Sequence, residues 1–371
     1  MEVKLNTSEQ MLLALLRASL HQREVETDAF QSASADDWKQ CYHLAARQGV
    51  MALAWDGVMK LPQELQPSKG LKLTWAMAVE AYEKKYARYC QTVAELSEFY
   101  QKQGIATVQL KGVGLSTYYP NPSHREGGDI DIFTFSADKN KMSDGEANKL
   151  ADELMVKQGI EVDMHSPKHS NFFYKGIPIE NHKTFLNVER FPIAVQVESI
   201  LKKVINPQHT ALLNGEYQIL TPSACFNTLF LAFHSAQHYG SGLALHHLCD
   251  WAMLVSKYGI QIPKELTDRR FLEAISALTC LCNRYLGTSY VILGGEVLAD
   301  EMLEEILHPK YLQRGIAVKG KMNIFLYKTK RFLYMSRINN RILYLPMWKR
   351  VWESIVIHVR KPDTIFRVEQ K

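Results

Sequence analysis

The segment IATVQLKGVGLSTYYPNPSHREGGDIDIF, residues 105–133, decides the fold of this chain. Its last five residues, DIDIF at 129–133, alternate acidic and apolar side chains. Successive side chains of a β-strand point to opposite faces of the sheet, so Asp129 and Asp131 share one face while the isoleucines point into a core. The segment therefore predicts a strand that carries two carboxylates side by side.

The two aspartates form a candidate metal site. Residues two apart on a strand have alpha carbons about 6 to 7 Å apart, so the carboxylates of Asp129 and Asp131 can converge on two divalent ions roughly 4 Å apart. Without a cation the two negative charges repel each other, and bound Mg²⁺ removes that repulsion. The D-x-D pattern is short, and the residues around it make it more specific.

Four short motifs occur in order around this strand. They are LKG at 110–112, YP at 119–120, Arg125 and GDID at 128–131. The combination resembles the active-site region of the DNA polymerase beta-like nucleotidyltransferase superfamily, and is more closely similar to its uncharacterised bacterial nucleotidyltransferase family. The resemblance covers the middle third of the chain. It departs from the superfamily at the Gly-Ser pair after the first strand, which is Gly-Val at 112–113 here.

The resemblance implies an α+β fold in which a mixed sheet of the nucleotidyltransferase type is flanked by helical regions at both ends of the chain. It also implies an enzyme that transfers a nucleoside monophosphate from a nucleoside triphosphate (NTP) to an acceptor and releases pyrophosphate, with Mg²⁺ or Mn²⁺ as cofactor. The acceptor is a small molecule, a glycan, a protein or RNA. Transfer of the gamma phosphate is a variant of this function, and a nucleotide-binding protein without turnover is an alternative that Val113 in place of serine favours.

In the superfamily a third carboxylate on a neighbouring strand completes the metal site, and the resemblance implies Glu180 for this role. The run IENH at 179–182 looks like the family's E-x-H element. Pro178 directly before it predicts an irregular or edge strand, because proline lacks the N–H that a sheet ladder uses. Other candidates for the third carboxylate, each of which also fits a charge on a solvent-facing surface, are Glu161, Asp163 and Glu198.

Four residues near the strand are implied to contact the nucleotide: Lys111, Gly112, Arg125 and Gly128. A glycine after the first strand lets the backbone approach a ligand, and the amide groups at a helix start favour phosphate. Lys111 is placed to meet that phosphate, and the planar, always charged guanidinium of Arg125 suits a triphosphate. By themselves, the residues also allow a solvated turn lysine at 111 and a structural salt bridge from Arg125 to Asp129 or Asp131.

Helix and strand patterns divide the chain into three regions. Residues 1–103 are predicted to be helical, residues 104–220 form the catalytic core, and residues 221–371 are helical again with a basic, aromatic tail. In the core, apolar runs on both sides of the KG pair at 175–176 predict a β-hairpin. The TP pair at 221–222 predicts the start of a helix, with threonine as the cap and proline as the first helical residue.

Composition and length are those of an ordinary globular chain: 371 residues, 46% apolar and 22% charged. No run reaches the roughly 18 apolar residues of a transmembrane helix, and the apolar run at 11–20 lacks the features of a signal peptide. The six cysteines are scattered. The closest two, Cys280 and Cys282, point apart on a helix, so a reducing cytoplasm is the expected compartment.

A second polar group lies in the third region. His234 and His238 are four residues apart, which puts them on one helix face at the spacing of a two-histidine metal site. The run HLCD at 247–250 matches a further element of the family. The resemblance favours a bracing role for these residues, with Asp250 orienting a histidine. Zinc binding and a substrate-facing His238 are the alternatives.

The C-terminal part of the chain is basic. Residues 310–371 contain 15 Lys and Arg against 3 Asp and Glu, and aromatic residues are interleaved with the basic ones. Such a pattern binds nucleic acid through phosphate contacts and stacking, or an anionic membrane surface. In both cases residues 310–371 would bind an anionic partner. If the protein acted only as an adaptor through these residues, the D-x-D strand would have a structural role. A helical bundle with a solvated positive exterior is the third interpretation.

Overall fold

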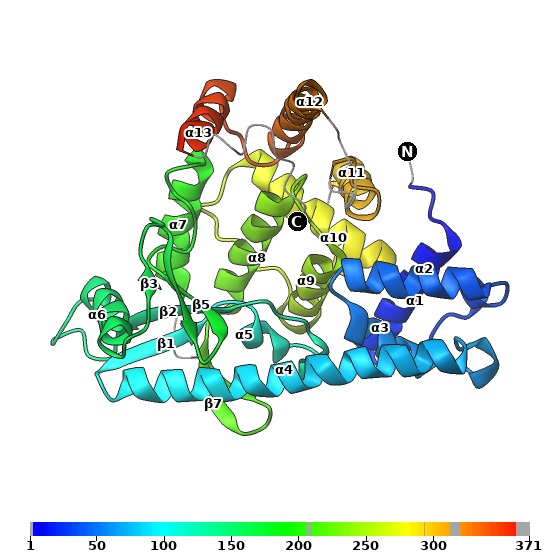
Figure 1. Ribbon diagram of the computed structural model, residues 1–371, viewed down its shortest axis with the longest axis horizontal. Coiled ribbons are helices and arrows are strands. Elements are labelled where there is room, and N and C mark those ends of the chain that lie inside the picture. Colours follow the sequence, from blue (N-terminus) through cyan, green and yellow to red (C-terminus); the bar gives the residue numbers. More distant parts are fainter. Residues whose placement is uncertain (1–2, 206–208, 293, 312–319, 361–371) are drawn as a thin grey trace.

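A seven-stranded mixed sheet lies at the centre of the chain, with helices before and after it (Figure 1). The computed structural model describes residues 3–205, 209–292, 294–311 and 320–360. Among these residues the strand order in the sheet is β3-β4-β5-β2-β1-β7-β6. The α+β class with helical regions at both ends, which the resemblance implied, is confirmed.

The sheet mixes parallel and antiparallel pairs. β2 is antiparallel to β1 and parallel to β5, and β7 is parallel to β1. The pairs β3 with β4, β4 with β5 and β6 with β7 are antiparallel. The strands are β1 Ile105–Gln109, β2 Ile130–Ser136, β3 Val162–Asp163, β4 His169–Tyr174, β5 Ile177–His182, β6 His209–Leu213 and β7 Tyr217–Thr221.

Several helices begin at a side-chain cap. Asn6 caps the first helix and Ser34 the second, each in a reciprocal pair with an acidic residue three positions on. The α-helices of the described ranges are α1 Thr7–His21, α2 Ala35–Arg47, α3 Met51–Val58, α4 Lys69–Gln101, α5 Val113–Ser116, α6 Asp144–Lys157, α7 Pro192–Val204, α8 Ala224–His238, α9 Leu245–Tyr258, α10 Arg269–Tyr285, α11 Glu296–Leu307, α12 Lys321–Asn339 and α13 Met347–Arg360.

Helix α8 begins later than the sequence pattern predicted. Its cap is Ser223, whose hydroxyl accepts a hydrogen bond from the backbone N–H of Phe226 at 3.1 Å. Thr221 still belongs to β7, where it pairs with His209 of β6. The predicted cap at Thr221 was wrong because strand pairing with β6, together with the following proline, keeps Thr221 extended. Strand β6 itself was not predicted.

β4 and β5 form the predicted hairpin. Its two turn residues have positive φ, 51° at Lys175 and 76° at Gly176, as is typical of two-residue hairpin turns. Pro178 lies inside β5, a regular strand between β4 and β2, so the expected irregularity was wrong. At Pro178 itself only β4 is a neighbour. The pairing of β5 with β2 begins at Ile179, so the missing N–H of Pro178 removes no hydrogen bond from that ladder.

Different helices cover the two faces of the sheet. The isoleucines of β2 and β5 point into a core cluster with α4 and α6. On the opposite face, Phe133 packs on Phe185 with ring centroids 4.9 Å apart, and Phe185 packs on Phe226 of α8 at 4.8 Å. Asp131 shares the face of Phe133, because side chains two apart on a strand point the same way. The acidic face therefore lies beneath the later helices.

Helices from both ends of the chain share one apolar core. Side chains of α1–α3 and of α8–α11 belong to the same buried cluster. Trp75 of α4 and Trp251 of α9 are fully buried in it. Their indole N–H groups donate to the carbonyl oxygen of Met51 at 2.9 Å and to the hydroxyl of Thr279 at 3.0 Å. The polar atoms of both rings are thus satisfied inside the core.

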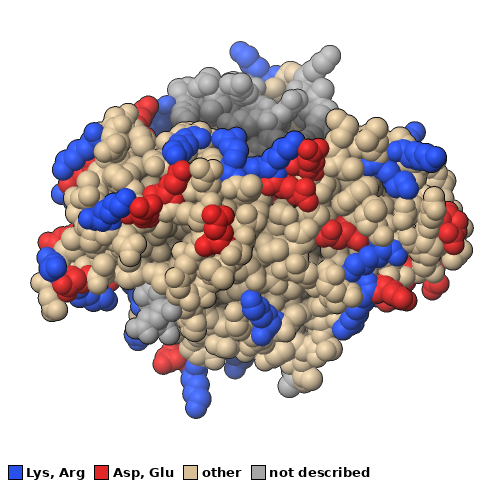
Figure 2. Space-filling view, turned by 90° about the horizontal axis from the view of Figure 1, so that it is seen from below, with Lys and Arg blue, Asp and Glu red and all other residues tan. Residues whose placement is uncertain are grey.

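Charge is mixed on the face that is seen from below. Figure 2 shows Lys and Arg interspersed with Asp and Glu over this face, so it carries no large patch of one sign. The basic helices α12 and α13 lie at the other side of the molecule, the top of Figure 1. Within the described ranges, no helix has the length and apolar character needed to cross a membrane.

Candidate active site

Asp131 of β2 and Glu180 of β5 lie side by side. The two strands are parallel neighbours, and their register pairs Asp131 with Glu180. Asp131 is 1% exposed, while the side chain of Glu180 is 23% exposed. Strand pairing therefore places the carboxylate that the resemblance implied next to the second aspartate of the D-x-D run.

Asp129 directly precedes β2 and lies at the edge of the same group. Its side chain is 36% exposed, so it is far more accessible than Asp131. Burial and the negative charge of Asp131 raise the pKa of Asp129 above its ordinary value, although Lys111 opposes this shift. The two aspartates thus differ in environment: one is buried, and the other is reachable from solvent.

Lys111 lies between the carboxylates. Its Nζ is 3.1 Å from Oδ1 of Asp131 and 3.9 Å from Oδ2 of Asp129. The side chain is only 15% exposed, so the alternative of a solvated turn lysine was wrong. Burial alone would lower the pKa of Lys111, but the charges of Asp131, Asp129 and Glu180 outweigh burial and raise it. The ammonium group is therefore charged.

His182, at the end of β5, contacts both strand carboxylates. Its Nε2 is 3.0 Å from Oδ1 of Asp131 and 3.5 Å from Oε2 of Glu180. Burial opposes ionisation of Asp131, but the charge of Lys111 and the hydrogen bond with His182 hold its pKa well below its usual range. Burial also opposes ionisation of Glu180, and the His182 hydrogen bond and Lys111 lower its pKa nonetheless. Both carboxylates are therefore anionic at neutral pH.

The group fits a divalent cation. Oδ2 of Asp131 is buried and has no hydrogen-bond partner among the described residues, a condition that costs about 1–3 kcal/mol. One ligand atom each of Asp131, Glu180 and His182 lies within 4.8 Å of the others. Two carboxylates and an imidazole are ligands that divalent cations accept. A bound cation would give the unpartnered oxygen of Asp131 its missing contact.

The other acidic candidates are engaged elsewhere. Glu161 is exposed, and Asp163 accepts a hydrogen bond from the backbone N–H of His165 at 2.9 Å. Glu198 of α7 accepts hydrogen bonds from two backbone N–H groups after β5, at 3.0 and 2.9 Å. Of the four candidates, Glu180 is the one that strand pairing places beside the D-x-D run.

Arg125 is held by helix α9. Its Nε and Nη2 donate to the two carboxylate oxygens of Asp250 at 3.1 and 2.7 Å. The hydroxyl of Tyr119 donates to the same carboxylate at 2.6 Å. The salt-bridge partner of Arg125 is thus Asp250, where the sequence suggested Asp129 or Asp131. Asp250 in turn binds an arginine and a tyrosine, where the sequence analysis expected it to orient a histidine.

Gly112 and Gly128 shape the backbone around Lys111. Gly112 has a φ of 56°, and a Cβ there would lie 3.2 Å from the backbone oxygen of Asp129, so both conformation and space favour glycine. Gly128 has open space around its alpha carbon, and its carbonyl accepts a hydrogen bond from the Tyr89 hydroxyl at 2.9 Å. The helix after Gly112, α5, is only four residues long.

Lys168 and His169 belong to the same group, and the sequence analysis missed them. Nδ1 of His169 is 3.8 Å from Oε2 of Glu180, and its ring stacks on His182 with centroids 5.4 Å apart. Burial and the nearby charge of Lys111 lower the pKa of Lys168. No motif indicated either residue, because only the pairing of β4 with β5 brings them to the carboxylates.

A hydrogen-bond network on the other face of the sheet anchors β5. Asn148 of α6 donates to Oδ1 of Asn181 and to the carbonyl oxygen of His182, at 3.0 and 2.9 Å. Asn181 in turn donates to Asp152 of α6 at 2.9 Å. Because Asn181 lies between Glu180 and His182 in the strand, these bonds fix the position of both site residues.

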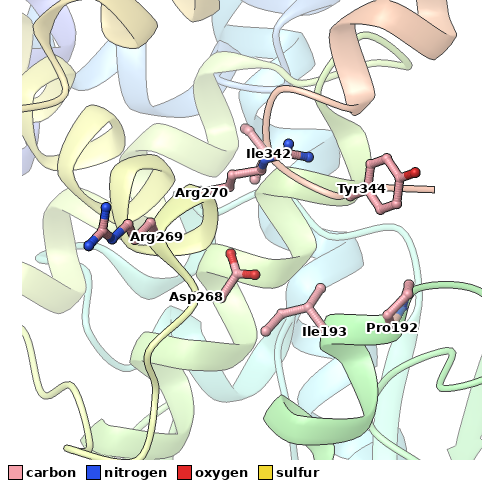
Figure 3. Close-up of a pocket in the computed structure, with 7 residues that line it drawn as sticks. All are labelled: Pro192, Ile193, Asp268, Arg269, Arg270, Ile342 and Tyr344. Carbon is pink, nitrogen blue, oxygen red and sulfur yellow. The ribbon is translucent and has the colours of Figure 1, made fainter. Parts of the chain in front are cut away.

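A surface pocket of about 380 Å³ lies apart from this group, where the starts of α7 and α10 face the segment before α13 (Figure 3). Two of its charged residues have structural contacts. Asp268 caps α10 by accepting a hydrogen bond from the backbone N–H of Phe271 at 2.9 Å, and the guanidinium of Arg270 lies 5.3 Å from the ring centre of Tyr344. The pocket shares no lining residue with the carboxylate group, so we do not assign it to the site.

Comparison with known proteins identifies a family. The family model described as uncharacterised nucleotidyltransferase matches residues 34–287, which is more than half of the chain. The matched span includes β2, β5 and every residue of the carboxylate group. No curated protein and no solved structure matches the chain.

Proposed function

The chain belongs to the uncharacterised nucleotidyltransferase family, and from this premise we propose that it transfers a nucleoside monophosphate from an NTP to an acceptor with release of pyrophosphate. The observation that carries the proposal is the pairing of Asp131 with Glu180 across β2 and β5, with Asp129 at the edge of the pair. Three carboxylates at one place on a sheet, one with a buried unpartnered oxygen, suit a divalent cation.

Asp129, Asp131 and Glu180 would hold the cation, and His182 keeps two of them in place. When bound, Mg²⁺ or Mn²⁺ supplies charge neutralisation for the triphosphate and activation of the attacking acceptor oxygen. The lowered pKa values of Asp131 and Glu180 mean that neither needs to lose a proton before it binds a cation. Of the three carboxylates, Asp129 has the most exposed side chain, so it would be the first to meet a ligand that arrives from solvent.

The lysines supply positive charge for the phosphates. Lys111 balances the carboxylates at 3.1 Å from Asp131, and its ammonium group would contact a phosphate oxygen bound beside them. Lys168 adds a second ammonium whose charge reaches the same carboxylates. Together they would offset the charge that builds up on the departing pyrophosphate.

Arg125 and the glycines complete the proposed nucleotide site. Asp250 binds Nε and Nη2 of Arg125, which fixes the guanidinium plane. The third nitrogen, Nη1, faces the glycine turns: a Cβ added at Gly112 or Gly127 would lie 3.9 or 3.7 Å from it. We assign Nη1 to a phosphate contact, while Gly112 and Gly128 let the triphosphate approach the backbone.

Calorimetric titration of ATP, GTP, CTP and UTP into the full chain with Mg²⁺ tests nucleotide binding. We expect metal-dependent binding of at least one NTP, and its loss in a folded Asp129→Ala/Asp131→Ala variant. Asp163→Ala is the matched control, because this carboxylate is 60% exposed on β3 and bonded to His165. Unchanged binding in the folded double variant would overturn the site assignment.

Pyrophosphate release tests the reaction. The bound NTP is incubated with pools of small molecules, glycans, proteins and RNA, and the full chain is compared with Asp131→Ala. Release that depends on an acceptor pool and on Asp131 supports nucleotidyl transfer. Formation of a nucleoside diphosphate without pyrophosphate would show gamma-phosphate transfer instead, and NTP binding without any product would show a nucleotide-binding protein without turnover.

A further inference from the structure

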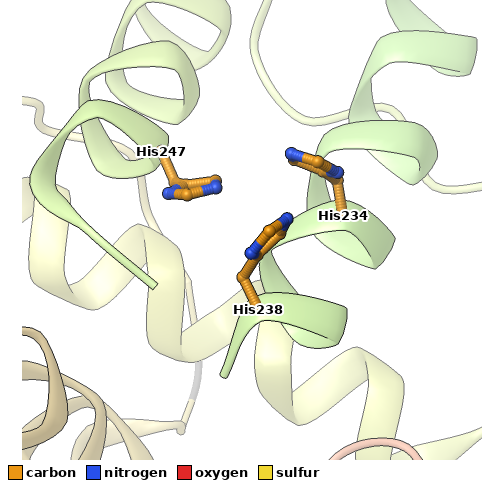
Figure 4. A group of neighbouring side chains, drawn as sticks. All are labelled: His234, His238 and His247. Carbon is orange, nitrogen blue, oxygen red and sulfur yellow. The ribbon is translucent and has the colours of Figure 1, made fainter. Parts of the chain in front are cut away.

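Three histidines from two helices converge near the candidate active site (Figure 4). His234 and His238 project from the last turns of α8, and His247 projects toward them from the first turn of α9. One ring nitrogen of each residue lies within 4.8 Å of the other two. The ring centroids are 4.5 to 5.3 Å apart, and the ring planes are inclined by 37° to 66°.

The local structure explains why these rings meet. His234 and His238 share one face of α8 because they are one helical turn apart. The chain then reverses direction, so that the start of α9 lies beside the end of α8. Phe230, one turn before His234, packs edge-on to His182 with centroids 6.5 Å apart. His234 therefore lies one helical turn along α8 from Phe230, the residue that contacts His182 of the carboxylate group.

We propose that His234, His238 and His247 bind a transition-metal ion of the zinc class. Three histidines are a ligand set for Zn²⁺, which binds imidazole nitrogen at about 2.0–2.1 Å and keeps a fourth position for another ligand. Small side-chain movements bring nitrogens that are already within 4.8 Å of one another to a common ion. The backbone N–H of Ala244 donates to Nδ1 of His247 over 3.2 Å, a long bond in a first helical turn that water can replace.

The charges around the three histidines indicate which fourth ligand a bound metal ion would take. The residues that the structure groups here are imidazoles without a carboxylate, and the charges of Lys111 and Lys168 reach His234. A divalent ion in this positive environment favours an anionic oxygen, such as phosphate, as its remaining ligand. The carboxylate group offers mainly oxygen ligands, which suit a hard cation such as Mg²⁺, whereas the three imidazoles suit zinc, so the two sites differ in the metal that they favour.

Cobalt spectroscopy on the metal-free full chain tests this site, because Co²⁺ in a tetrahedral nitrogen site absorbs visible light through d–d transitions. We expect one bound Co²⁺ with such bands, which Zn²⁺ abolishes and inorganic phosphate shifts. His234→Gln and His238→Gln should each weaken Co²⁺ binding by about tenfold or more. The bands should persist in Asp129→Asn/Asp131→Asn and in His165→Gln, the control for a histidine that is 97% exposed.

Three results would overturn the proposal: a folded wild type without d–d bands, equal Co²⁺ binding in the histidine variants, or bands that disappear only in the carboxylate variant. Circular dichroism verifies folding of each variant. His247 is 6% exposed, so the decisive variants are at His234 and His238, which are half-buried. The spectra require no nucleotide and no turnover. They therefore test the histidine site independently of the proposed nucleotidyltransferase reaction.

A second inference rests on the exposed apolar side chains of α12 and α13. On α13, seven apolar residues are 41% to 73% exposed: Met347, Trp348, Val351, Trp352, Ile355, Ile357 and Val359. At about 100° per residue, six of the seven occupy one continuous arc of the helix, and Ile357 lies outside this arc. On α12, four are 48% to 69% exposed: Met322, Phe325, Leu326 and Leu333. Apolar and basic side chains together line a groove of these two helices.

Charge complementarity identifies the partner of this surface. Residues 320–360 contain nine Lys and Arg and a single acidic residue, Glu353. Of the nine, Arg350 is buried and Arg341 is paired with Glu301. We infer that α12 and α13 lie on an anionic membrane surface, with the apolar arc between the lipid headgroups and the basic side chains on their phosphates. Exposed tryptophans such as Trp348 favour the membrane interface. Val351, Ile355 and Val359 offer no ring for base stacking, so single-stranded nucleic acid fits this surface less well.

Vesicle sedimentation tests this surface with the full chain. We expect binding to phosphatidylcholine vesicles that contain phosphatidylserine, weaker binding in high salt, and little binding to phosphatidylcholine alone. Trp348→Ser/Trp352→Ser should reduce binding by about tenfold or more. Leu73→Ser/Met77→Ser is the matched control, because these residues are 64% and 63% exposed on α4. RNA binding without vesicle binding, or self-association that only the tryptophan variant loses, would overturn the inference.

Discussion

Arg125 binds both carboxylate oxygens of Asp250, and this ion pair joins the segment before β2 to helix α9. The side chains are 11% and 7% exposed, so water does little to screen the two charges. Asp250 lies three residues after His247 in the same helix. The ion pair therefore fixes the segment before the D-x-D strand relative to the helix that carries His247.

Replacement of Arg125 is expected to destabilise the fold strongly. Arg125→Ala leaves the buried carboxylate of Asp250 without its cation, which costs about 3–5 kcal/mol of unfolding free energy. Urea unfolding followed by circular dichroism measures the loss. Arg341→Ala is the control, because its pair with Glu301 is exposed on both sides and should contribute less than about 1 kcal/mol. Equal losses in the two variants would contradict this account.

Glu180→Gln is expected to abolish most of the pyrophosphate release. The substitution keeps the shape of the side chain but removes the negative charge beside Asp131, so we expect turnover to fall by about 100-fold or more in a variant that still folds. Glu161→Gln, which changes an exposed carboxylate near β3, should retain turnover. The assignment fails if the Glu161 variant is the inactive one.

His124 is expected to make stability depend on pH. Its Nδ1 is 2.9 Å from Asp56 of α3 and its Nε2 is 3.0 Å from Glu83 of α4. Burial alone would lower the pKa of His124, but the hydrogen bonds to the two carboxylates outweigh burial and raise it above its usual value of 6.5. The folded state thus binds the proton more tightly than the unfolded state.

This linkage has a definite sign. The stabilising contribution of His124 is fully present below about pH 6.5 and is lost as the pH rises through the higher pKa of the folded state. Urea unfolding across this range should show the difference in stability between wild type and His124→Gln shrinking as pH rises. A difference that stays constant, or grows with pH, would exclude the charged histidine bridge.

Gly57 is expected to tolerate no side chain. A Cβ at this position of α3 would lie 2.6 Å from the carbonyl oxygen and 2.7 Å from the alpha carbon of Leu15 in α1. Backbone atoms cannot rotate aside, so Gly57→Ala should destabilise by about 1–3 kcal/mol. Gly70→Ala in α4, where nothing lies within 4 Å, should be neutral or stabilise by up to about 1 kcal/mol. Thermal unfolding of both variants makes the comparison.

Local sequence was sufficient for much of the fold. The alternation at 129–133 predicted a strand, which forms from Ile130 onward with Asp129 just before it. The pair at 175–176 predicted a hairpin turn, which forms as predicted. These features depend on interactions between residues a few positions apart: side-chain period, turn conformation and the order of short motifs. For the same reason the motifs around Asp129 indicated the family over a continuous stretch of chain.

Tertiary structure alone decided which distant residues meet. The sequence listed four acidic candidates, and the parallel register of β2 with β5 determined that Glu180 lies beside Asp131. Lys168 joins the group only because β4 pairs with β5, and Arg125 binds Asp250 because α9 packs against the segment before β2. A buried charged side chain pairs with the opposite charge that the tertiary fold places next to it. The spacing of residues along the chain does not specify which residue that is.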